Sequence, residues 1–397
     1  MEERKSSFTS FFPSFTSPEG VRLSNRLLEK GLRVTMMRST EIRETLVPEF
    51  KKYVEERKRL KCWVDNIQGP LFAAIDVTYR CNLRCPYCYL SAGERHSAPT
   101  LSFKDFTHII DILVNESRIL GLCICGGEPT LHPRLQEMIA YAKEHDLIVN
   151  MVTNGTILND QLAKKLSKLE IDSVQVSLDG STPEVMDRLR GRGTFKRAVN
   201  AIQALVSNNI ITMAAMTLTK FNIHDFPNVA ELSEKLRLYS LRTMFYIPEH
   251  TRHMPLVPSD EEYKQVIQWI QNNQRNYRCI FEFGDPTEHI TLGPYIGHLM
   301  ISINPEGFIL PSPYISLAYG NILREPWQEL WPELEKLWFE NPVFNAISRY
   351  LRNERDFMIL GRIGLNRQEK ENIVNVRDLK QNEAYHLANL IREVLHA

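Results

Sequence analysis

The chain has 397 residues, 48 Lys and Arg balanced by 48 Asp and Glu, and 43% hydrophobic residues. This length and apolar content suit two domains with a buried core. The neutral balance creates no long-range field for nucleic acid or an anionic membrane, so neither is expected as a partner. Residues 1–18 lack the apolar run of a signal peptide or membrane anchor, and the expected location is cytoplasmic.

Residues 1–69 are predicted to form a helical amino-terminal extension that is partly mobile. Residues 1–20 are rich in Ser, Phe and Pro, whereas residues 21–60 combine charges with scattered Leu, Ile and Val, as surface helices do. This part of the sequence lacks the alternating three-strand pattern of a leader-peptide recognition module. It therefore gives no independent indication of a peptide substrate.

From about residue 70, short apolar runs alternate with longer segments of helical period. Six strands are predicted over residues 71–79, 122–125, 147–153, 173–178, 211–217 and 243–247. Helices are predicted after them over residues 103–113, 133–145, 158–169, 195–208, 226–238 and 260–273. Because parallel neighbours need crossovers of this length, we predict an α/β fold in which residues 70–275 form a partial (β/α)6 TIM-like barrel.

The pattern changes after the predicted barrel. Residues 298–310 contain two alternating runs around a Pro-Glu-Gly turn, which predicts a β-hairpin. Residues 327–339 and 384–395 are amphipathic and are predicted to be helices. We expect residues 276–397 to form a small α+β carboxyl-terminal domain.

Three of the seven cysteines, Cys81, Cys85 and Cys88, lie in the loop after the first predicted strand. An odd cysteine count disfavours a secreted disulfide framework, and clustered thiols in a reducing compartment more often bind metal. A tetrahedral zinc ion would need a fourth ligand from elsewhere. On a four-iron cluster, three thiolates leave one iron open to a substrate or cofactor. The spacing alone leaves both kinds of site as alternatives.

A second motif closes the second predicted strand, where Gly126, Gly127 and Glu128 follow Cys125. Two glycines allow the backbone to approach a ligand closely, although a strand-to-helix turn could use them as well. Together, CNLRCPYC and GGEPTLHP at successive strand ends resemble the radical S-adenosylmethionine (SAM) superfamily over residues 71–250. The resemblance implies one [4Fe–4S] cluster held by the three cysteines, with SAM chelating the open iron.

The resemblance also implies SAM-binding positions at the ends of the predicted strands. These are Tyr87 in the cysteine loop, Gly126, Gly127 and Glu128 after the second strand, Thr153 and Asn154 after the third, Ser177 and Asp179 after the fourth, Arg190 in LRGRG, and Thr217 in the fifth. The glycine segment would receive the methionine amino group through backbone carbonyls. Arg190 would pair with the SAM carboxylate, and a solvated helix-end arginine is its alternative role.

The implied reaction is reductive cleavage of SAM to a 5′-deoxyadenosyl radical, which abstracts hydrogen from a substrate. Flavodoxin or ferredoxin is the implied electron donor. Cys125 and Cys279 are the candidate thiols for returning a hydrogen atom to the substrate. A small barrel residue is the simpler interpretation of Cys125, because Cys123 and Cys125 alternate on one strand.

Residues 302–322 resemble the carboxyl-terminal segment of SPASM or twitch-type maturases. Ser312 stands where the first auxiliary-cluster cysteine is expected, and no cysteine follows Cys279. We therefore expect a domain that keeps the fold without an auxiliary cluster, and a redox-neutral or externally reduced reaction. The subgroup indicates a peptide or protein residue as substrate. The alternatives are a small metabolite or cofactor precursor and, from another class, a non-catalytic iron–sulfur protein.

Overall fold

The computed structural model describes residues 69–95, 98–248, 251–284, 290, 300–351, 355–363, 365 and 373–396. The chain divides into two compact units, Met1–Asp65 and Asn66–Ala397. Every described residue belongs to the second unit. The expectation for residues 1–69 therefore lies outside the described residues, apart from Gly69.

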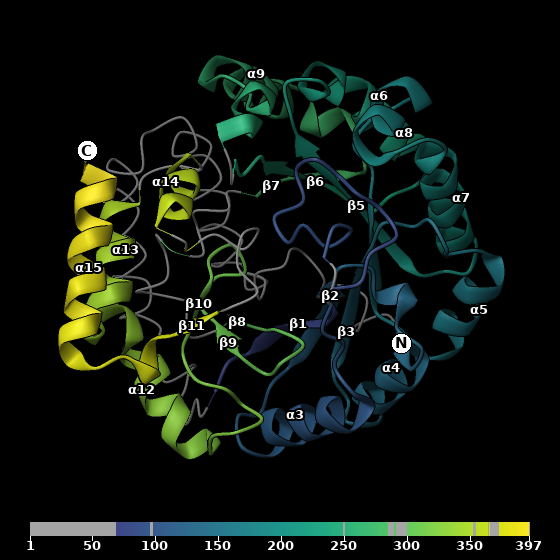
Figure 1. Cartoon of the computed structure of the whole chain (residues 1–397). Helices are drawn as coiled ribbons and strands as arrows, with labels where there is room; N and C mark the ends of the chain where they lie inside the picture. Colours follow the sequence, from purple (N-terminus) through teal and green to yellow (C-terminus); the bar gives the residue numbers. More distant parts are fainter. Residues whose placement is uncertain are drawn as a thin grey trace. The chain divides into compact units, whose positions relative to one another are not determined.

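A nine-stranded sheet organises the second unit (Figure 1). Its strands are β1 (Phe72–Thr78), β2 (Gly121–Gly126), β3 (Ile148–Thr153), β4 (Ser173–Ser177), β5 (Ile211–Leu218), β6 (Ser240–Phe245), β7 (Ile280–Gly284), β8 (Met300–Ile303) and β9 (Ile309–Leu310). They lie in the order β7-β6-β5-β4-β3-β2-β1-β8-β9. All neighbours are parallel except β8 and β9.

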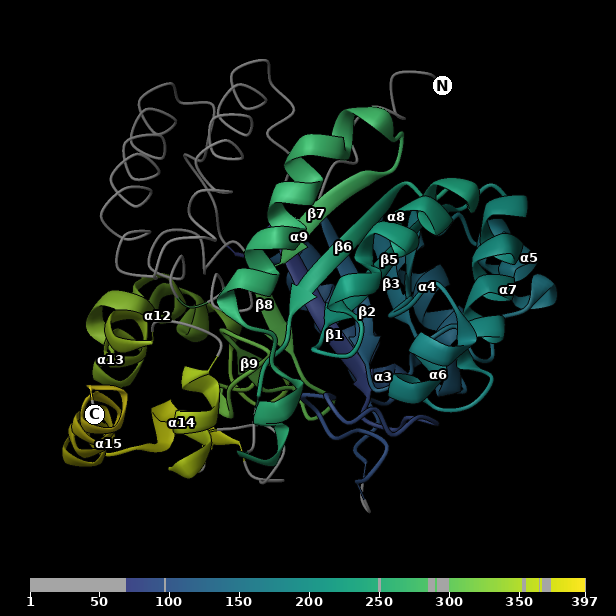
Figure 2. The same cartoon turned by 90° about the horizontal axis from the view of Figure 1, so that it is seen from above.

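Helices follow the first six strands and cover the outer face of the sheet (Figures 1 and 2). They are α3 (Phe103–Asn115), α4 (Leu135–Glu144), α5 (Asp160–Lys168), α6 (Pro183–Arg190), α7 (Thr194–Ser207), α8 (Phe226–Lys235) and α9 (Asp260–Asn273). Short 3-10 turns are η2 (Pro129–Leu131), η3 (Ile223–Asp225), η4 (Thr251–Leu256) and η5 (Gln274–Asn276). The six strand–helix units confirm the predicted (β/α)6 arrangement, with α6 as an unpredicted addition.

Alternation along each strand separates an outer from an inner face of the sheet. In β5, the even-numbered residues are buried and the odd-numbered ones are partly exposed. Because successive side chains of a strand point to opposite faces, the buried set packs on the helices. Helix α3 shows the matching pattern, with Phe106, Ile109, Ile110 and Leu113 buried and Ser102 as its N-cap. The inner face is therefore the less buried of the two.

The sheet continues beyond the predicted barrel. Strand β7 pairs with β6, and β8 pairs with β1 as well as with β9. The β8–β9 pair confirms the predicted hairpin, but one of its strands also extends the barrel sheet. Exposed edges of a parallel sheet present unpaired backbone groups, which an added strand satisfies. The boundary expected at residue 275 therefore falls inside the sheet.

The carboxyl-terminal part is mainly helical. It contains β10 (Leu317–Ala318), β11 (Val374–Asn375), α12 (Trp327–Glu340), α13 (Pro342–Tyr350), α14 (Asp356–Arg362), η6 (Val376–Asp378) and α15 (Gln381–His396). Helices α12 and α15 confirm the two amphipathic predictions. Helix α13 packs between them, and all three lie together beyond β8 and β9 (Figure 1).

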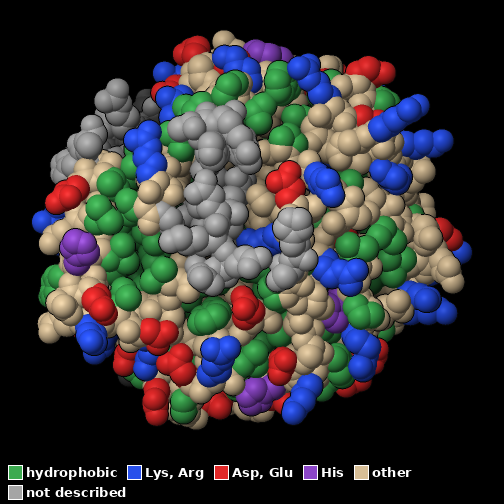
Figure 3. All heavy atoms as spheres, viewed as in Figure 1, with side chains coloured by type: hydrophobic (Ala, Val, Ile, Leu, Met, Phe, Trp, Pro, Cys, Tyr) green, Lys and Arg blue, Asp and Glu red, His purple; other side chains and the backbone are tan. Residues whose placement is uncertain are grey.

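Within the described ranges, no helix combines the length and the apolar character needed to cross a membrane. On the face of the molecule drawn in Figure 3, side chains of Lys and Arg are interspersed with those of Asp and Glu. This mixture agrees with the neutral balance of the sequence.

Candidate functional site

The cysteine loop, residues 79–90, follows β1 at the carboxyl edge of the sheet. Cys81, Cys85 and Cys88 are each partly exposed. Two tight turns shape the loop: the backbone N–H of Cys88 donates to Cys85 O at 3.1 Å, and that of Ser91 donates to Cys88 O at 3.0 Å. Parallel barrels place their chemistry at this edge.

Backbone contacts hold the glycine motif against the start of the cysteine loop. The N–H of Gly127 donates to Thr78 O at 2.7 Å, and that of Glu128 donates to Arg80 O at 2.8 Å. A Cβ atom at Gly127 would lie 2.3 Å from Arg80 O, and one at Gly126, whose φ is 124°, would lie 2.4 Å from Thr78 O. Both positions require glycine, because any side chain would force the two segments apart.

The side chain of Glu128 is fully buried and joins the ends of β2 and β3. Its Oε1 accepts hydrogen bonds from Thr153 Oγ1 at 2.7 Å and from the N–H of Thr130 at 3.1 Å. Its Oε2 accepts the N–H of Asn154 at 2.7 Å. Sequence reasoning assigned only the backbone of Glu128 a role. The structure gives the carboxylate the task of fixing the loop after β3.

Asn154 carries this connection to the cysteine loop. Its Nδ2 donates to Asn82 Oδ1 at 2.9 Å and lies 3.9 Å from Cys81 Sγ, its second acceptor. The N–H of Leu83 donates to the same sulfur at 3.5 Å. N–H groups aimed at a sulfur stabilise a thiolate and tune the potential of an iron–sulfur cluster. Asn82, which sequence reasoning passed over, stands inside the cysteine motif itself.

A second buried carboxylate, that of Asp179, accepts hydrogen bonds from three of the residues predicted to bind SAM. Its Oδ2 accepts hydrogen bonds from Tyr87 Oη and Arg190 Nε, and its Oδ1 accepts the N–H of Thr217 at 2.8 Å. The guanidinium carbon of Arg190 also lies 5.5 Å from the centre of the Tyr87 ring. Asn222 Nδ2 donates to Asp179 O at 2.9 Å, which fixes the loop after β4. The carboxylate thus joins the ends of β4, α6 and the cysteine loop.

Burial and charge set the protonation of this group. Burial raises the pKa of Tyr87 well above its usual range, so it stays a neutral phenol that donates to Asp179. Burial alone would lower the pKa of Arg190, but the charge of Asp179 reverses the effect and raises it. Arg190 is therefore a permanent cation. Burial also raises the pKa of Cys85, while the nearby Arg190 opposes that rise.

An apolar cover lies over the cysteine loop. Tyr87 packs with Leu189, Tyr246 and Val257, and Cys85 contacts this cluster. The rings of Tyr87 and Tyr246 meet edge to face, with centroids 6.4 Å apart. Tyr246 directly follows β6. Its place at a strand end is therefore the sequence signal that could have identified it as a site residue. The cluster lowers the access of water to one side of the cysteine loop.

The remaining predicted residues lie at different edges of the sheet. Ser177 ends β4 on the inner face, and Cys125 lies beside Asp76 near the carboxyl end of β2. Cys279 instead precedes the amino end of β7, where it is fully buried and its N–H donates to Glu234 at 3.0 Å. This position, at the edge opposite the cysteine loop, does not support Cys279 as a donor to substrate.

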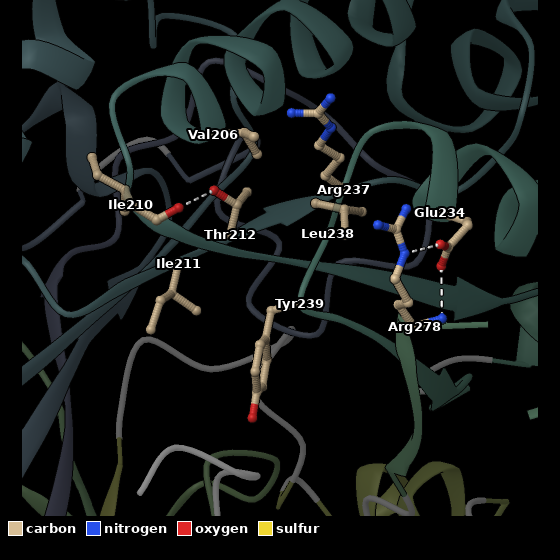
Figure 4. A pocket seen from close by; sticks show the side chains of 9 residues that line it. All are labelled: Val206, Ile210, Ile211, Thr212, Glu234, Arg237, Leu238, Tyr239 and Arg278. Carbon is tan, nitrogen blue, oxygen red and sulfur yellow. Dashed lines mark hydrogen bonds and ion pairs between the residues drawn. The ribbon is translucent and has the colours of Figure 1, made fainter. Parts of the chain in front are cut away.

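A pocket of about 370 Å³ lies at the same amino edge (Figure 4). It is lined by Val206, Ile210, Ile211, Thr212, Glu234, Arg237, Leu238, Tyr239 and Arg278. Two of its three charged side chains are paired with each other, because Arg278 Nε lies 2.7 Å from Glu234 Oε1. The pocket contains none of the predicted site residues and is separate from the carboxyl edge.

The thiols fit an iron–sulfur cluster better than a single metal ion. In the described parts of the chain, no three His, Cys, Asp or Glu side chains converge closely enough to hold one ion. Zinc would need its sulfur ligands to meet at about 2.3 Å from one point. A four-iron cluster offers a separate iron to each thiolate. The N–H groups at Cys81 and the close backbone approach at Gly127 complete the fit.

Polar contacts surround Ser312 and the neighbouring carboxyl-terminal segment, where the resemblance places the first auxiliary-cluster cysteine. Ser312 is fully buried, and its Oγ accepts the N–H of Tyr314 at 3.4 Å. Nearby, Arg377 pairs with Glu325 and Glu333, each at 3.0 Å. Side-chain hydrogen bonds and ion pairs therefore contribute to holding this segment.

Comparison with known proteins agrees with this site. The profile of the radical SAM superfamily matches residues 75–233. Mycofactocin maturase MftC of Mycolicibacterium smegmatis is 32% identical over 312 residues, which cover 73% of this chain and 76% of the maturase. The chain belongs to the radical SAM superfamily. Its cofactors are SAM and a [4Fe–4S] cluster.

Two further similarities extend the comparison. Fe-coproporphyrin III synthase of Methanosarcina barkeri is 30% identical over 255 residues, and the match spans 62% of each chain, less than two thirds of that relative. The structure of Streptococcus suis SuiB bound to its precursor peptide SuiA has a TM-score of 0.58 and 15% identity, covering 83% of this chain and 80% of SuiB. The second likeness concerns the fold alone.

Proposed function

We propose that this protein is a radical SAM enzyme that modifies a residue of a peptide or protein. The observation that carries the proposal is the pair of buried carboxylates, Glu128 and Asp179, which tie the ends of β2, β3, β4 and β5 around the cysteine loop. A protein that only stored an iron–sulfur cluster would not need four strand ends fixed around the cysteine loop. A site that orients a cofactor and a substrate does.

Each part of the site has a task in this proposal. Cys81, Cys85 and Cys88 would hold the cluster, and the segment from Gly126 to Glu128 would lie against SAM. When bound, the reduced cluster and SAM supply a 5′-deoxyadenosyl radical that abstracts a hydrogen atom. The chain's own residues orient the cofactor, exclude water through the cover around Tyr246, and keep the loops rigid.

The choice of a peptide substrate is supported by two similarities. One relative is named a mycofactocin maturase, and SuiB was solved with a precursor peptide. A second candidate function, the same radical chemistry on a small metabolite or cofactor precursor, is favoured by the similarity to Fe-coproporphyrin III synthase. Flavodoxin or ferredoxin is the proposed electron donor, and one cluster per chain is the proposed content.

The test is SAM cleavage by the reconstituted full chain. The protein is loaded with iron and sulfide without oxygen, reduced with dithionite in the presence of SAM, and assayed for 5′-deoxyadenosine by mass spectrometry. The wild type should form it, and the variant with Cys81→Ala, Cys85→Ala and Cys88→Ala should form none. Cys62→Ala, outside the motif, is the matched cysteine control. A cluster-loaded wild type without SAM cleavage would favour the non-catalytic alternative.

A further inference from the structure

The side chain of Asn154 uses every hydrogen-bonding position that an amide has. Its Oδ1 accepts the backbone N–H of Thr156 at 2.9 Å and the hydroxyl of Thr156 at 2.6 Å. Its Nδ2 donates to Asn82 Oδ1 at 2.9 Å and, more weakly, to Cys81 Sγ at 3.9 Å. A side-chain amide has two lone pairs and two N–H hydrogens, so these four contacts complete its set. In this arrangement the amide offers no position to SAM, the ligand that the resemblance implies for it.

The contact with Thr156 decides which way the amide points. A backbone N–H can only donate, so the atom of Asn154 that faces it must be the oxygen. The NH2 group is then the end that faces Cys81. Asn82 Nδ2 donates to Thr156 Oγ1 at 2.8 Å and thereby closes a ring of three side chains around this orientation.

The backbone on both sides of Asn154 is fixed as well. Its own N–H donates to Oε2 of the buried Glu128 at 2.7 Å. Thr153 Oγ1 donates to Glu128 Oε1 at 2.7 Å and accepts the N–H of Gly155 at 3.1 Å. The fold of the loop after β3, rather than a mobile side chain, therefore sets the distance from the amide to Cys81.

The sulfur of Cys81 lies in a partly apolar setting with few polar contacts. It packs against a cluster formed by Tyr79, Leu90 and Ala92. The backbone N–H of Leu83 donates to Cys81 Sγ at 3.5 Å. Where the local dielectric is low, a hydrogen bond has a larger electrostatic effect than it has in water. A second N–H group aimed at this sulfur should therefore have a measurable effect on a cluster bound to it.

We propose that Asn154 is a positioning residue whose amide donates to the Cys81 thiolate and raises the reduction potential of the bound cluster. Reduction makes the cluster more negative, so an N–H donor at one of its sulfur ligands stabilises the reduced form more than the oxidised form. The inference rests on the proposed function, which places the cluster on the three cysteines. It deepens that function by naming a residue that favours entry of the electron.

The test is an anaerobic redox titration of the cluster-loaded full chain without SAM. The solution potential is set where half of the wild-type cluster is reduced, and preparations with equal iron per chain are compared. The reduced fraction is measured from the intensity of the electron paramagnetic resonance signal. In Asn154→Ala, the ratio of reduced to oxidised cluster should fall by about threefold or more, because one hydrogen bond to the thiolate is lost.

Two further variants separate the amide from a general effect on stability. Thr156→Val removes the hydroxyl that orients the amide but keeps the backbone N–H, so the ratio should fall in the same direction by a smaller factor. Asn159→Ala is the matched control. Asn159 is exposed and caps α5 by accepting the N–H of Leu162 at 3.0 Å. This variant loses a helix cap and should keep the wild-type ratio.

An unchanged ratio in Asn154→Ala would overturn the inference, as would an equal fall in Asn159→Ala. If Asn154→Ala takes up no cluster, a wild-type ratio in Thr156→Val would overturn it. The 5′-deoxyadenosine assay on the same preparations separates the two proposals. A ratio that depends on Asn154 in a protein that does not cleave SAM would support the inference and remove the proposed function. SAM cleavage with an unchanged ratio would do the reverse.

Discussion

Asp179 and Arg190 form an ion pair that is almost wholly withdrawn from solvent, with 0% of the aspartate side chain and 11% of the arginine side chain exposed. The pair joins the loop after β4 to the last turn of α6. Because Tyr87 donates to the same carboxylate, the pair also holds the cysteine loop. The negative charge of Asp179 therefore holds the cysteine loop and α6 together through contacts within the protein itself.

Asp179→Asn should destabilise the protein strongly, because it leaves the cation of Arg190 buried without its partner. Removing one member of a buried pair typically costs about 3–5 kcal/mol. Urea unfolding should show the loss, and the double variant with Arg190→Gln should lose less than the sum of the two single changes. Asp160→Asn, in an exposed pair with Lys164, should leave the urea midpoint unchanged. Strict additivity of the two single changes would contradict the coupling.

Gly127→Ala should prevent normal cluster loading. The new Cβ would lie 2.3 Å from Arg80 O, so the glycine motif and the cysteine loop must separate. Iron per chain after reconstitution should fall to less than half of the wild-type value. Gly193→Ala is the control, because its Cβ would meet nothing within 4 Å although its φ is 79°. That variant should keep its iron, and backbone strain should lower its free energy of unfolding by only about 1 kcal/mol. Full iron content in Gly127→Ala would show that the contact is dispensable.

Cys279 should be inert to alkylation in the folded protein. Burial raises its pKa from 9.0 to about 12, so at pH 8 its thiolate fraction is about a thousandfold below that of an unperturbed thiol. Iodoacetamide labelling, followed by peptide mass spectrometry, should modify Cys279 only in urea. Native labelling at a rate within tenfold of the unfolded chain would show that the thiol is accessible.

The same thiol adds a pH dependence to stability. A pKa raised on folding stabilises the protein fully below the unfolded pKa of about 9, and this contribution is lost as the pH rises toward 12. Cys279→Ala should remove that part of the decline in the urea midpoint between pH 9 and 11. An identical decline in both proteins would assign it to other groups.

Arg377→Gln should destabilise the carboxyl-terminal part without changing the iron content. Arg377 pairs with Glu325 and Glu333 at 3.0 Å each, and its side chain is 19% exposed. The loss should be about 1–3 kcal/mol, because two carboxylates lose a charged partner. Lys336→Gln, in an exposed pair with Glu340, is the control and should not change stability. A drop in iron per chain would instead indicate a metal in this part of the protein.

The sequence predicted the strand–helix alternation and the strand ends that carry the site, because both depend on local periodicity and on motifs. Strands β1 to β5 lie within about two residues of their predicted bounds, whereas β6 begins at Ser240 rather than at residue 243. Ser240 is a polar residue, so an apolar pattern does not include it. The burial of Ser240 depends on its pairing with Met213 and Ile280 in the neighbouring strands.

Long-range pairing and side-chain roles could not be predicted in the same way. The contact of β8 with β1 joins residues 300–303 to residues 72–75, and no local pattern encodes that partnership. The motif identified Glu128 but not the three residues that donate hydrogen bonds to its carboxylate, Thr130, Thr153 and Asn154.

The most direct test of the central claim is the electron paramagnetic resonance spectrum of the reduced, reconstituted protein before and after SAM is added. Wild-type protein with four irons per chain should show the signal of a reduced four-iron cluster, and SAM should shift it if SAM binds the open iron as proposed. The triple cysteine-to-alanine variant should show no such signal. A cluster signal that SAM does not change would contradict a SAM-binding site at the cysteine loop.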